Sequence, residues 1–106
     1  MATLETSRRE LDTILRQTLG SSNVYYQPPA SVKMGVPCIR YQLNKLQDIR
    51  ANNKFYNEFH EYQVIYITRS AEDPKIDELL ALPLCRFDRT YISENLYHYV
   101  YTIYHK

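Results

Sequence analysis

The end of the chain concentrates the side chains that could do chemistry. Residues 84–104, LCRFDRTYISENLYHYVYTIY, hold a cysteine, a histidine, an aspartate, two arginines and a series of tyrosines. A cysteine nucleophile needs a histidine base within hydrogen-bond reach and a third group that orients the imidazole. Only Cys85 and His98 fall on neighbouring predicted strands. Nothing local supplies an oxyanion hole, so both are interpreted as packing residues.

Two pairs of carboxylates have the residue types for general acid–base catalysis. Asp88 and Glu94 bracket a predicted turn, whereas Asp73 and Asp77 open a predicted helix. Anions are favoured in the first turn of a helix in any case, because the helix dipole is positive there. We therefore expect that the protein is not an enzyme.

Cationic and aromatic side chains could instead bind nucleic acid. Arg86 and Arg89 either form a phosphate-binding patch or, as we favour, are solvated or take part in cross-strand ion pairs. Tyr97, Tyr99 and Tyr101 resemble a base-stacking row, but single-strand binders add a basic groove, and the net charge is only +1. We assign these tyrosines to the core or to a subunit interface, where tyrosine is enriched. A small nucleic-acid-binding module remains an alternative.

Composition narrows the kinds of binding site and the locations that remain for the protein. Cys38 and Cys85 lie far apart with no CxxC motif, which predicts reduced thiols rather than a metal site or a disulfide. The chain has two glycines, too few for a Walker or Rossmann phosphate loop, so we expect no cofactor. There is no apolar run of the roughly 20 residues that span a membrane, and the first residues lack the apolar core of a signal peptide. We expect a soluble protein that is made in the cytoplasm.

Apolar spacing predicts the elements that position these residues. A helix over 6–19 buries four residues at helical spacing, with Gly20 as its stop. Ser7 and Glu10 are a possible capping box, and Thr3 or Thr6 is an alternative cap. A second helix begins at Asp73, an N-cap followed by Pro74. The predicted buried residues are, in the first helix, Leu11, Ile14, Leu15 and Leu19 and, in the second, Ile76, Leu79, Leu80 and Leu82.

Strand patterns fill most of the remaining chain. Short β-prone runs lie at 23–27 and 36–43, and 59–68 has apolar residues on both faces, as a central strand does. The last part of the chain is predicted to be a hairpin that turns at 93–95, with Cys85, Phe87, Arg89 and Tyr91 on one face of its first strand.

Residues 44–58, NKLQDIRANNKFYNE, show no regular spacing of apolar residues, which predicts a long loop or a projecting hairpin. The whole chain, 1–106, then forms one domain of the α+β class. We expect an antiparallel or mixed sheet with the N-terminal helix and the second helix packed on one face.

Two segments of the sequence resemble a known group of proteins. YYQPPASVKMGVPCIRYQL, early in the chain, together with PLCRFDRTYISENLYHYVYTIY at its end, is similar to tail terminator, or tail completion, proteins of long-tailed bacteriophages. The resemblance covers 25–104 and contains no catalytic motif. Its matching positions are Tyr26, Pro28, Pro29, Pro37, Cys38, Tyr62, Leu84, Cys85, Phe87, Asp88, Asn95, Leu96 and His98.

The resemblance implies a non-enzymatic virion subunit in the neck. Such a subunit forms a ring, typically a hexamer, on the tail-tube protein and presents a surface to a head-completion or stopper protein. DNA would pass through the lumen only in transit. A head-closure or adaptor subunit is the alternative within the neck.

The resemblance also motivates a hypothesis for assembly. Residues 45–57 would order against a neighbouring subunit or the tube, with Phe55 and Tyr56 as anchors and Arg50 and Lys54 as a polar rim. Alternatively, Phe55 and Tyr56 simply begin the next strand. Deleting 46–54 without loss of assembly and infectivity would remove the hypothesis.

Overall fold

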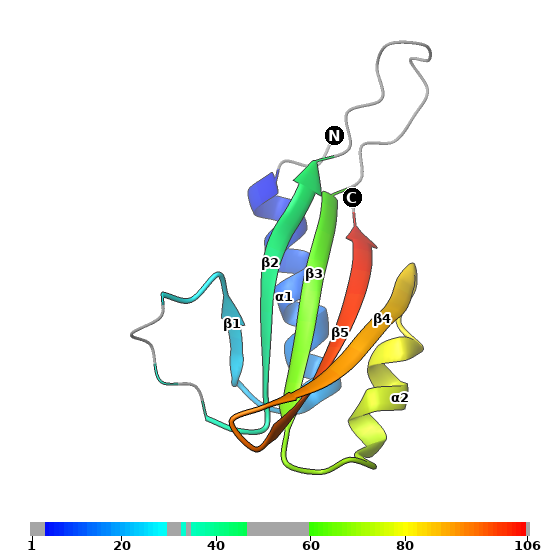
Figure 1. Ribbon diagram of the computed structural model, residues 1–106. Helices are drawn as coiled ribbons and strands as arrows, with labels where there is room; N and C mark the ends of the chain where they lie inside the picture. The colour runs from blue at the N-terminus through cyan, green and yellow to red at the C-terminus, as the bar shows by residue number, and fades with distance from the viewer. Residues whose placement is uncertain (1–3, 30–32, 34, 47–59, 106) are drawn as a thin grey trace.

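The computed structural model describes residues 4–29, 33, 35–46 and 60–105. These residues form two helices and five strands (Figure 1). Their order is α1 (Leu4–Leu19), β1 (Val24–Tyr26), β2 (Cys38–Leu46), β3 (His60–Thr68), α2 (Pro74–Leu80), β4 (Cys85–Ser93) and β5 (Leu96–His105).

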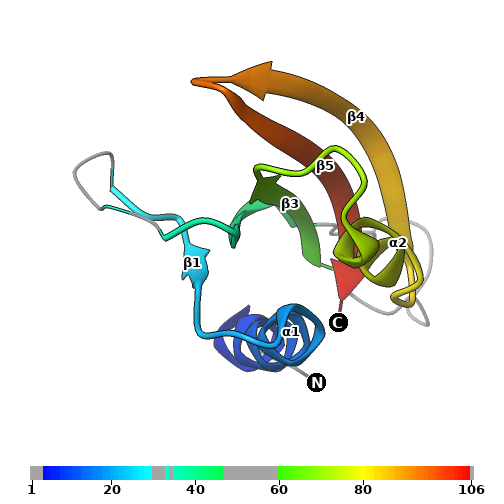
Figure 2. The same cartoon turned by 90° about the horizontal axis from the view of Figure 1, so that it is seen from below.

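The five strands form one mixed sheet in the order β1-β2-β3-β5-β4. β1 pairs with β2 in parallel, and the other neighbours are antiparallel. The predicted α+β class is confirmed, and β3 lies in the middle of the sheet as its two apolar faces indicated. Figure 2 shows both helices on one side of the sheet and the β4–β5 hairpin curling away from them.

The main core lies between the helices and the sheet. It is unusual in its tyrosines, of which Tyr41, Tyr62, Tyr66 and Tyr101 are fully buried. Burying a hydroxyl costs free energy unless it finds a partner, and each of the four donates a hydrogen bond. The acceptors are, in the same order, Asp12 (2.5 Å), Ser7 (3.1 Å), Asp73 (2.6 Å) and the backbone carbonyl of Ile76 (2.9 Å). The tyrosines therefore fix the helices at defined positions on the sheet.

The beginning of α1 differs from the prediction. α1 already starts at Leu4, so Ser7 lies inside the helix and is not its cap. Ser7 is fully buried and donates to the carbonyl of His105 (3.4 Å) while it accepts from Tyr62. The predicted end is confirmed, because Gly20 has a φ of 74° and its N–H donates to the carbonyl of Arg16.

α2 begins as predicted. Asp73 is the N-cap, and its carboxylate accepts from the N–H of Lys75 (2.9 Å). The helix ends at Leu80, so Leu82, the last residue of the predicted buried stripe, lies outside it. Leu79 is buried, but Leu80 is 44% exposed, so its assignment to the buried stripe was wrong. Only one side of this short helix packs against the core, and Leu80 does not lie on that side.

A bulge in β4 changes which residues share a face. Phe87 pairs with Tyr101 and Arg89 pairs with Val100, and the register shifts between them at Asp88. The extra residue turns both Arg89 and Tyr91 to the face opposite Cys85 and Phe87, so the prediction that these four residues share a face was wrong. The predicted turn is confirmed, since Glu94 and Asn95 both have positive φ, as in a two-residue type I′ hairpin.

The two edges of the sheet are built differently. β1 is only three residues long, and the carbonyl of Val24 on its outer side accepts a hydrogen bond from the guanidinium of Arg16 (3.2 Å). The same guanidinium binds the carbonyl of Ser22 (3.1 Å). The opposite edge is β4, which is nine residues long.

Candidate interaction surface

The structure separates Cys85 and His98, the candidate nucleophile and base, by the sheet itself. Cys85 pairs with Ile103 on the helix side of the sheet, whereas His98 lies on the open face. Cys38 shares the open face with His98, but Ile67 stands between them, which separates them by two strand spacings of about 4.8 Å each. Burial raises the pKa of the Cys38 thiol, and burial followed by the nearby Asp88 raises that of Cys85 to about 11. Neither thiol is prepared to act as a nucleophile at neutral pH.

Two of the four candidate carboxylates, Asp73 and Asp88, have structural partners. Asp73 caps α2 and also accepts from the hydroxyls of Tyr66 and Thr68. Burial alone would raise the pKa of Asp73, but these hydrogen bonds outweigh it and hold the pKa below its usual value. Asp88 accepts from Thr102 and from the guanidinium of Arg86. Within the described part of the chain, no group of three or more metal-ligating side chains lies close enough to hold an ion.

Both cations of β4 are exposed, as the solvated alternative predicted, and the ion pair that Arg86 forms lies within β4 and not across strands. Arg86 forms an ion pair with Asp88 at 3.3 Å. Arg89 lies over the ring of Tyr91, with its guanidinium carbon 5.8 Å from the ring centroid. Tyr91 in turn stacks on His98, with centroids 4.7 Å apart and planes 12° apart.

The three candidate tyrosines of β5, Tyr97, Tyr99 and Tyr101, lie on the helix side of the sheet. Tyr101 is fully buried and Tyr99 is 9% exposed, and their hydroxyls bind carbonyls of Ile76 and Ala71. The sequence left two roles open for these tyrosines, core or interface. Tyr99 and Tyr101 are as buried as core residues, and the single chain already covers both rings. Tyr97 is half-buried at the margin of the same core. The other interface candidates, Arg50, Lys54, Phe55 and Tyr56, lie outside the described residues.

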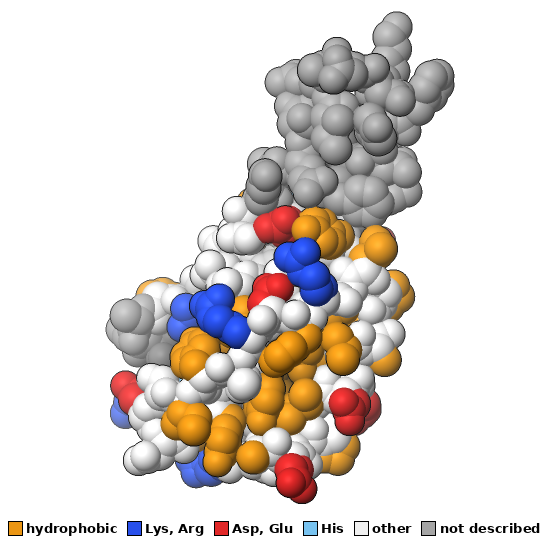
Figure 3. All heavy atoms as spheres, turned by 45° about the vertical axis from the view of Figure 1, so that its right-hand side comes forward, with side chains coloured by type: hydrophobic (Ala, Val, Ile, Leu, Met, Phe, Trp, Pro, Cys, Tyr) orange, Lys and Arg blue, Asp and Glu red, His pale blue; other side chains and the backbone are white. Residues whose placement is uncertain are grey.

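The exposed apolar side chains gather instead along β4 and the turn before it. We call this group the β4-edge surface, and Figure 3 looks onto this side of the molecule. Eight of the nine residues of β4 are exposed. The members of the surface, with their exposed fractions, are Leu80 (44%), Leu84 (59%), Phe87 (41%), Tyr91 (37%) and Ile92 (66%).

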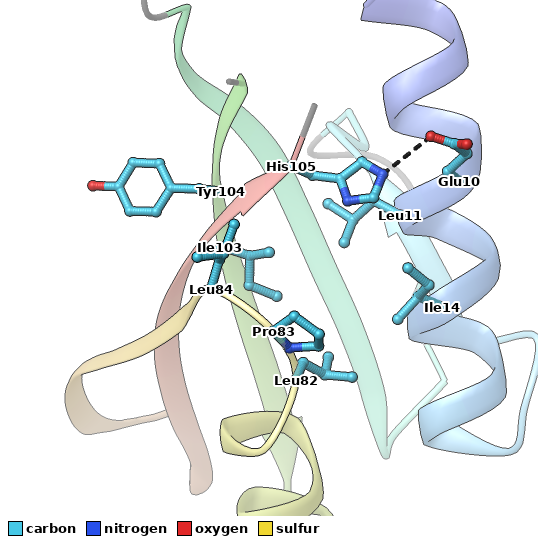
Figure 4. A pocket seen from close by; sticks show the side chains of 9 residues that line it. All are labelled: Glu10, Leu11, Ile14, Leu82, Pro83, Leu84, Ile103, Tyr104 and His105. Carbon is cyan, nitrogen blue, oxygen red and sulfur yellow. Dashed lines mark hydrogen bonds and ion pairs between the residues drawn. The ribbon is translucent and has the colours of Figure 1, made fainter. Parts of the chain in front are cut away.

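A hollow of about 500 Å³ lies next to this surface on the helix side. We call it the helix-side pocket. Figure 4 shows it between α1 and the α2–β4 turn, with His105 pointing toward Glu10 at 3.2 Å across its rim. Its lining is mostly apolar and consists of Glu10, Leu11, Ile14, Leu82, Pro83, Leu84, Ile103, Tyr104 and His105.

A second hollow of about 400 Å³ lies on the open face of the curled sheet. We call it the open-face pocket. Its floor is formed by Cys38, Ile65 and Ile67, and Arg40 and His98 are among the residues that line it. The helix-side and open-face pockets therefore differ in both position and chemistry.

The sequence did not reveal the β4-edge surface. An alternating strand such as 85–93 usually buries one face, and the pattern alone does not say that the helices stop short of it. The signal that the sequence did offer is an apolar residue at each end of the strand, at 84 and 92.

The described part of the chain has no helix long and apolar enough to cross a membrane. No family model, curated protein or solved structure matches the chain.

Proposed function

We propose that this protein is a structural subunit of a phage virion, a tail terminator whose ring caps the tail tube and joins the tail to the head-completion complex. The observation that carries the assembly role is the β4-edge surface, which leaves five large apolar side chains exposed on a small domain. These side chains lie along one edge of the sheet and point to both of its faces, with Phe87 and Ile92 on the helix side and Tyr91 on the open face. Apolar side chains gathered in this way favour binding by another protein. The resemblance over 25–104 supplies the particular role.

Ring assembly also needs two surfaces that differ. In a closed ring of identical subunits each copy contacts its two neighbours through different, complementary faces. The helix-side and open-face pockets lie on opposite sides of the sheet and are built from different residues. This asymmetry supports a ring.

Leu84 is the residue whose change tests the proposal most directly. It is 59% exposed and belongs to both the β4-edge surface and the helix-side pocket. Leu84→Glu places a carboxylate in the apolar contact, at little cost to the isolated fold because the side chain is mostly in water. Gln17→Glu is the matched control, since it adds the same charge to the exposed side of α1.

The experiment mixes each protein with tail-tube subunits from the same genome. Native mass spectrometry and negative-stain imaging then report rings or capped tube ends. We expect capping by the wild type and by Gln17→Glu, and none by Leu84→Glu. A wild-type protein that leaves the tube ends bare and unbound would refute the terminator role.

A further inference from the structure

The outer edge of β4 has backbone groups without partners. β4 is the last strand of the sheet, and among the described residues the backbone of 89–93 receives hydrogen bonds only from β5. Such an edge is a template for another strand, and proteins protect edges with charges, prolines or bulges. β4 has these features in its first half, where Arg86, Asp88 and the bulge lie. Residues 89–93 are regular and contain neither proline nor lysine.

The hairpin turn determines which of these backbone groups are free. Ser93 and Leu96 flank the two-residue turn, so they form a hydrogen-bonded pair that points inward. Orientation alternates along the strand, so Tyr91 and Arg89 also point their N–H and C=O groups toward β5. The N–H and C=O groups of Thr90 and Ile92 therefore point outward.

The outward N–H and C=O groups of β4 in one copy can pair with the same groups in a second copy. When two copies of β4 run antiparallel about a two-fold axis at Tyr91, Thr90 of each copy lies opposite Ile92 of the other. Each outward N–H then meets an outward C=O, and the two Tyr91 residues face each other as a pair without hydrogen bonds between them. We propose that residues 89–93 of β4 pair in this register with the same residues of a second copy.

The side chains of β4 also favour a second copy of the chain as the partner. On the open face, the two Tyr91 rings come together while each stacks on its own His98. On the other face, Ile92, which is 66% exposed, packs beside Thr90 of the second copy. Arg89 and Glu94 have no ion-pair partners among the described residues, and the register brings Arg89 of one copy next to the turn that holds Glu94 of the other.

Access to the edge is open. Figure 2 shows the tip half of β4 extending beyond both helices, while α2 lies near the beginning of the strand. The contact is a strand pair and is therefore small, so the dimer should dissociate on dilution. The inference goes beyond the proposed function, because it concerns free subunits and not the ring.

Disulfide trapping tests the register. In a Cys85→Ser background, Tyr91→Cys places two thiols opposite each other with Cα atoms about 4.5 Å apart, within the range of about 4.4–6.8 Å that a disulfide needs. Ile92→Cys is the control, because its opposite residue is Thr90 and not itself. We expect Tyr91→Cys to cross-link about tenfold faster than Ile92→Cys under mild oxidation. Equal rates, or faster linking of Ile92→Cys, would overturn the register.

Proline substitution tests the edge contact without a cross-link. Because the N–H of Ile92 points away from β5, Ile92→Pro removes an outward donor and leaves the β4–β5 ladder intact. Sedimentation should give a concentration-dependent dimer for the wild type and Ile92→Val, and a folded monomer, checked by circular dichroism, for Ile92→Pro. A wild type that stays monomeric at its solubility limit would overturn the proposal.

The two proposals can fail separately. Leu84 lies at the other end of β4, eight residues from Ile92, or about 26 Å along an extended strand. Leu84→Glu should therefore retain the dimer while it abolishes tube capping. Dimers without tube binding would refute the terminator role alone, and capping by a wild type that never dimerises would refute the β4 pairing alone.

Discussion

The carboxylate of Asp73 accepts three hydrogen bonds, so its removal should destabilise the fold measurably. Its carboxylate accepts the N–H of Lys75 (2.9 Å) and the hydroxyls of Tyr66 (2.6 Å) and Thr68 (3.1 Å). Asp73→Ala deletes the cap of α2, which typically costs about 1 kcal/mol. It also leaves the buried Tyr66 hydroxyl without its acceptor, at a cost of about 1–3 kcal/mol. We expect a total loss of about 2–4 kcal/mol in the free energy of unfolding.

Urea titration followed by circular dichroism measures this loss. Tyr66→Phe removes one partner, so a double-mutant cycle isolates the coupling between Tyr66 and Asp73. Asp73→Asn is the matched control, because an amide oxygen still accepts at the N-cap. If Asp73→Ala cost less than about 0.5 kcal/mol, the range of ordinary surface changes, the network would not stabilise the fold as argued.

The same network predicts a dependence on pH. The pKa of Asp73 is lower in the folded state than its usual value of 3.8. The stabilisation is therefore fully present above the unfolded pKa and is lost as the pH falls through the folded one. The difference in stability between the wild type and Asp73→Asn should shrink below about pH 4. A difference that stays constant from neutral pH into acid would contradict the lowered pKa.

Three further predictions concern packing, reactivity and the turn. Leu79→Ala should cost about 2–5 kcal/mol by opening a cavity in the core, while Leu80→Ala, at a side chain 44% exposed, should stay within about 0.5 kcal/mol; equal costs in urea titration would contradict the burial. Cys85, with a pKa of about 11, should react with iodoacetamide at pH 8 far more slowly in the folded protein than in urea, and equal rates would refute its raised pKa. Glu94→Asn should stabilise the hairpin by about 0.5–1 kcal/mol, since asparagine tolerates the φ of 52° better; a lower melting temperature would count against this account of the turn.

The sequence predicted the elements that depend on local signals. The cap at Asp73, the stop at Gly20 and the turn at Glu94 and Asn95 follow from the chemistry of single residues, and the structure confirms all three. The central position of β3 followed from apolar residues on both of its faces. The α+β class followed from the order of these elements.

Two of the misassignments, at Ser7 and Arg89, come from long-range contacts. Ser7 has the spacing of a capping box, but its hydroxyl is used by Tyr62, which is 55 residues away in sequence. Arg89 changed face because Asp88 bulges, where it also binds Thr102 of the neighbouring strand. Neither contact leaves a trace in the local pattern.

The candidate surface was harder to predict than the fold. The tyrosines of β5 had the composition of an interface, but α2 and the residues before it cover Tyr99 and Tyr101 and accept their hydroxyl protons in hydrogen bonds. The apolar residues left exposed are on the next strand, at Leu84 and Ile92. Which of two neighbouring strands is covered depends on where the helices end, and this is decided by the packing of the whole domain.

The short β1 strand, with Arg16 on the outward carbonyl of Val24, limits how far a sheet of paired subunits can grow. A subunit with two open edges could add copies without end and form a fibre. Here one edge is open and the other is blocked by an arginine from α1. Two subunits joined through β4 would expose only their blocked edges, so strand addition would stop at the pair. In such a pair the guanidinium of Arg16 would hinder strand addition at β1, and the pairing itself would cover β4.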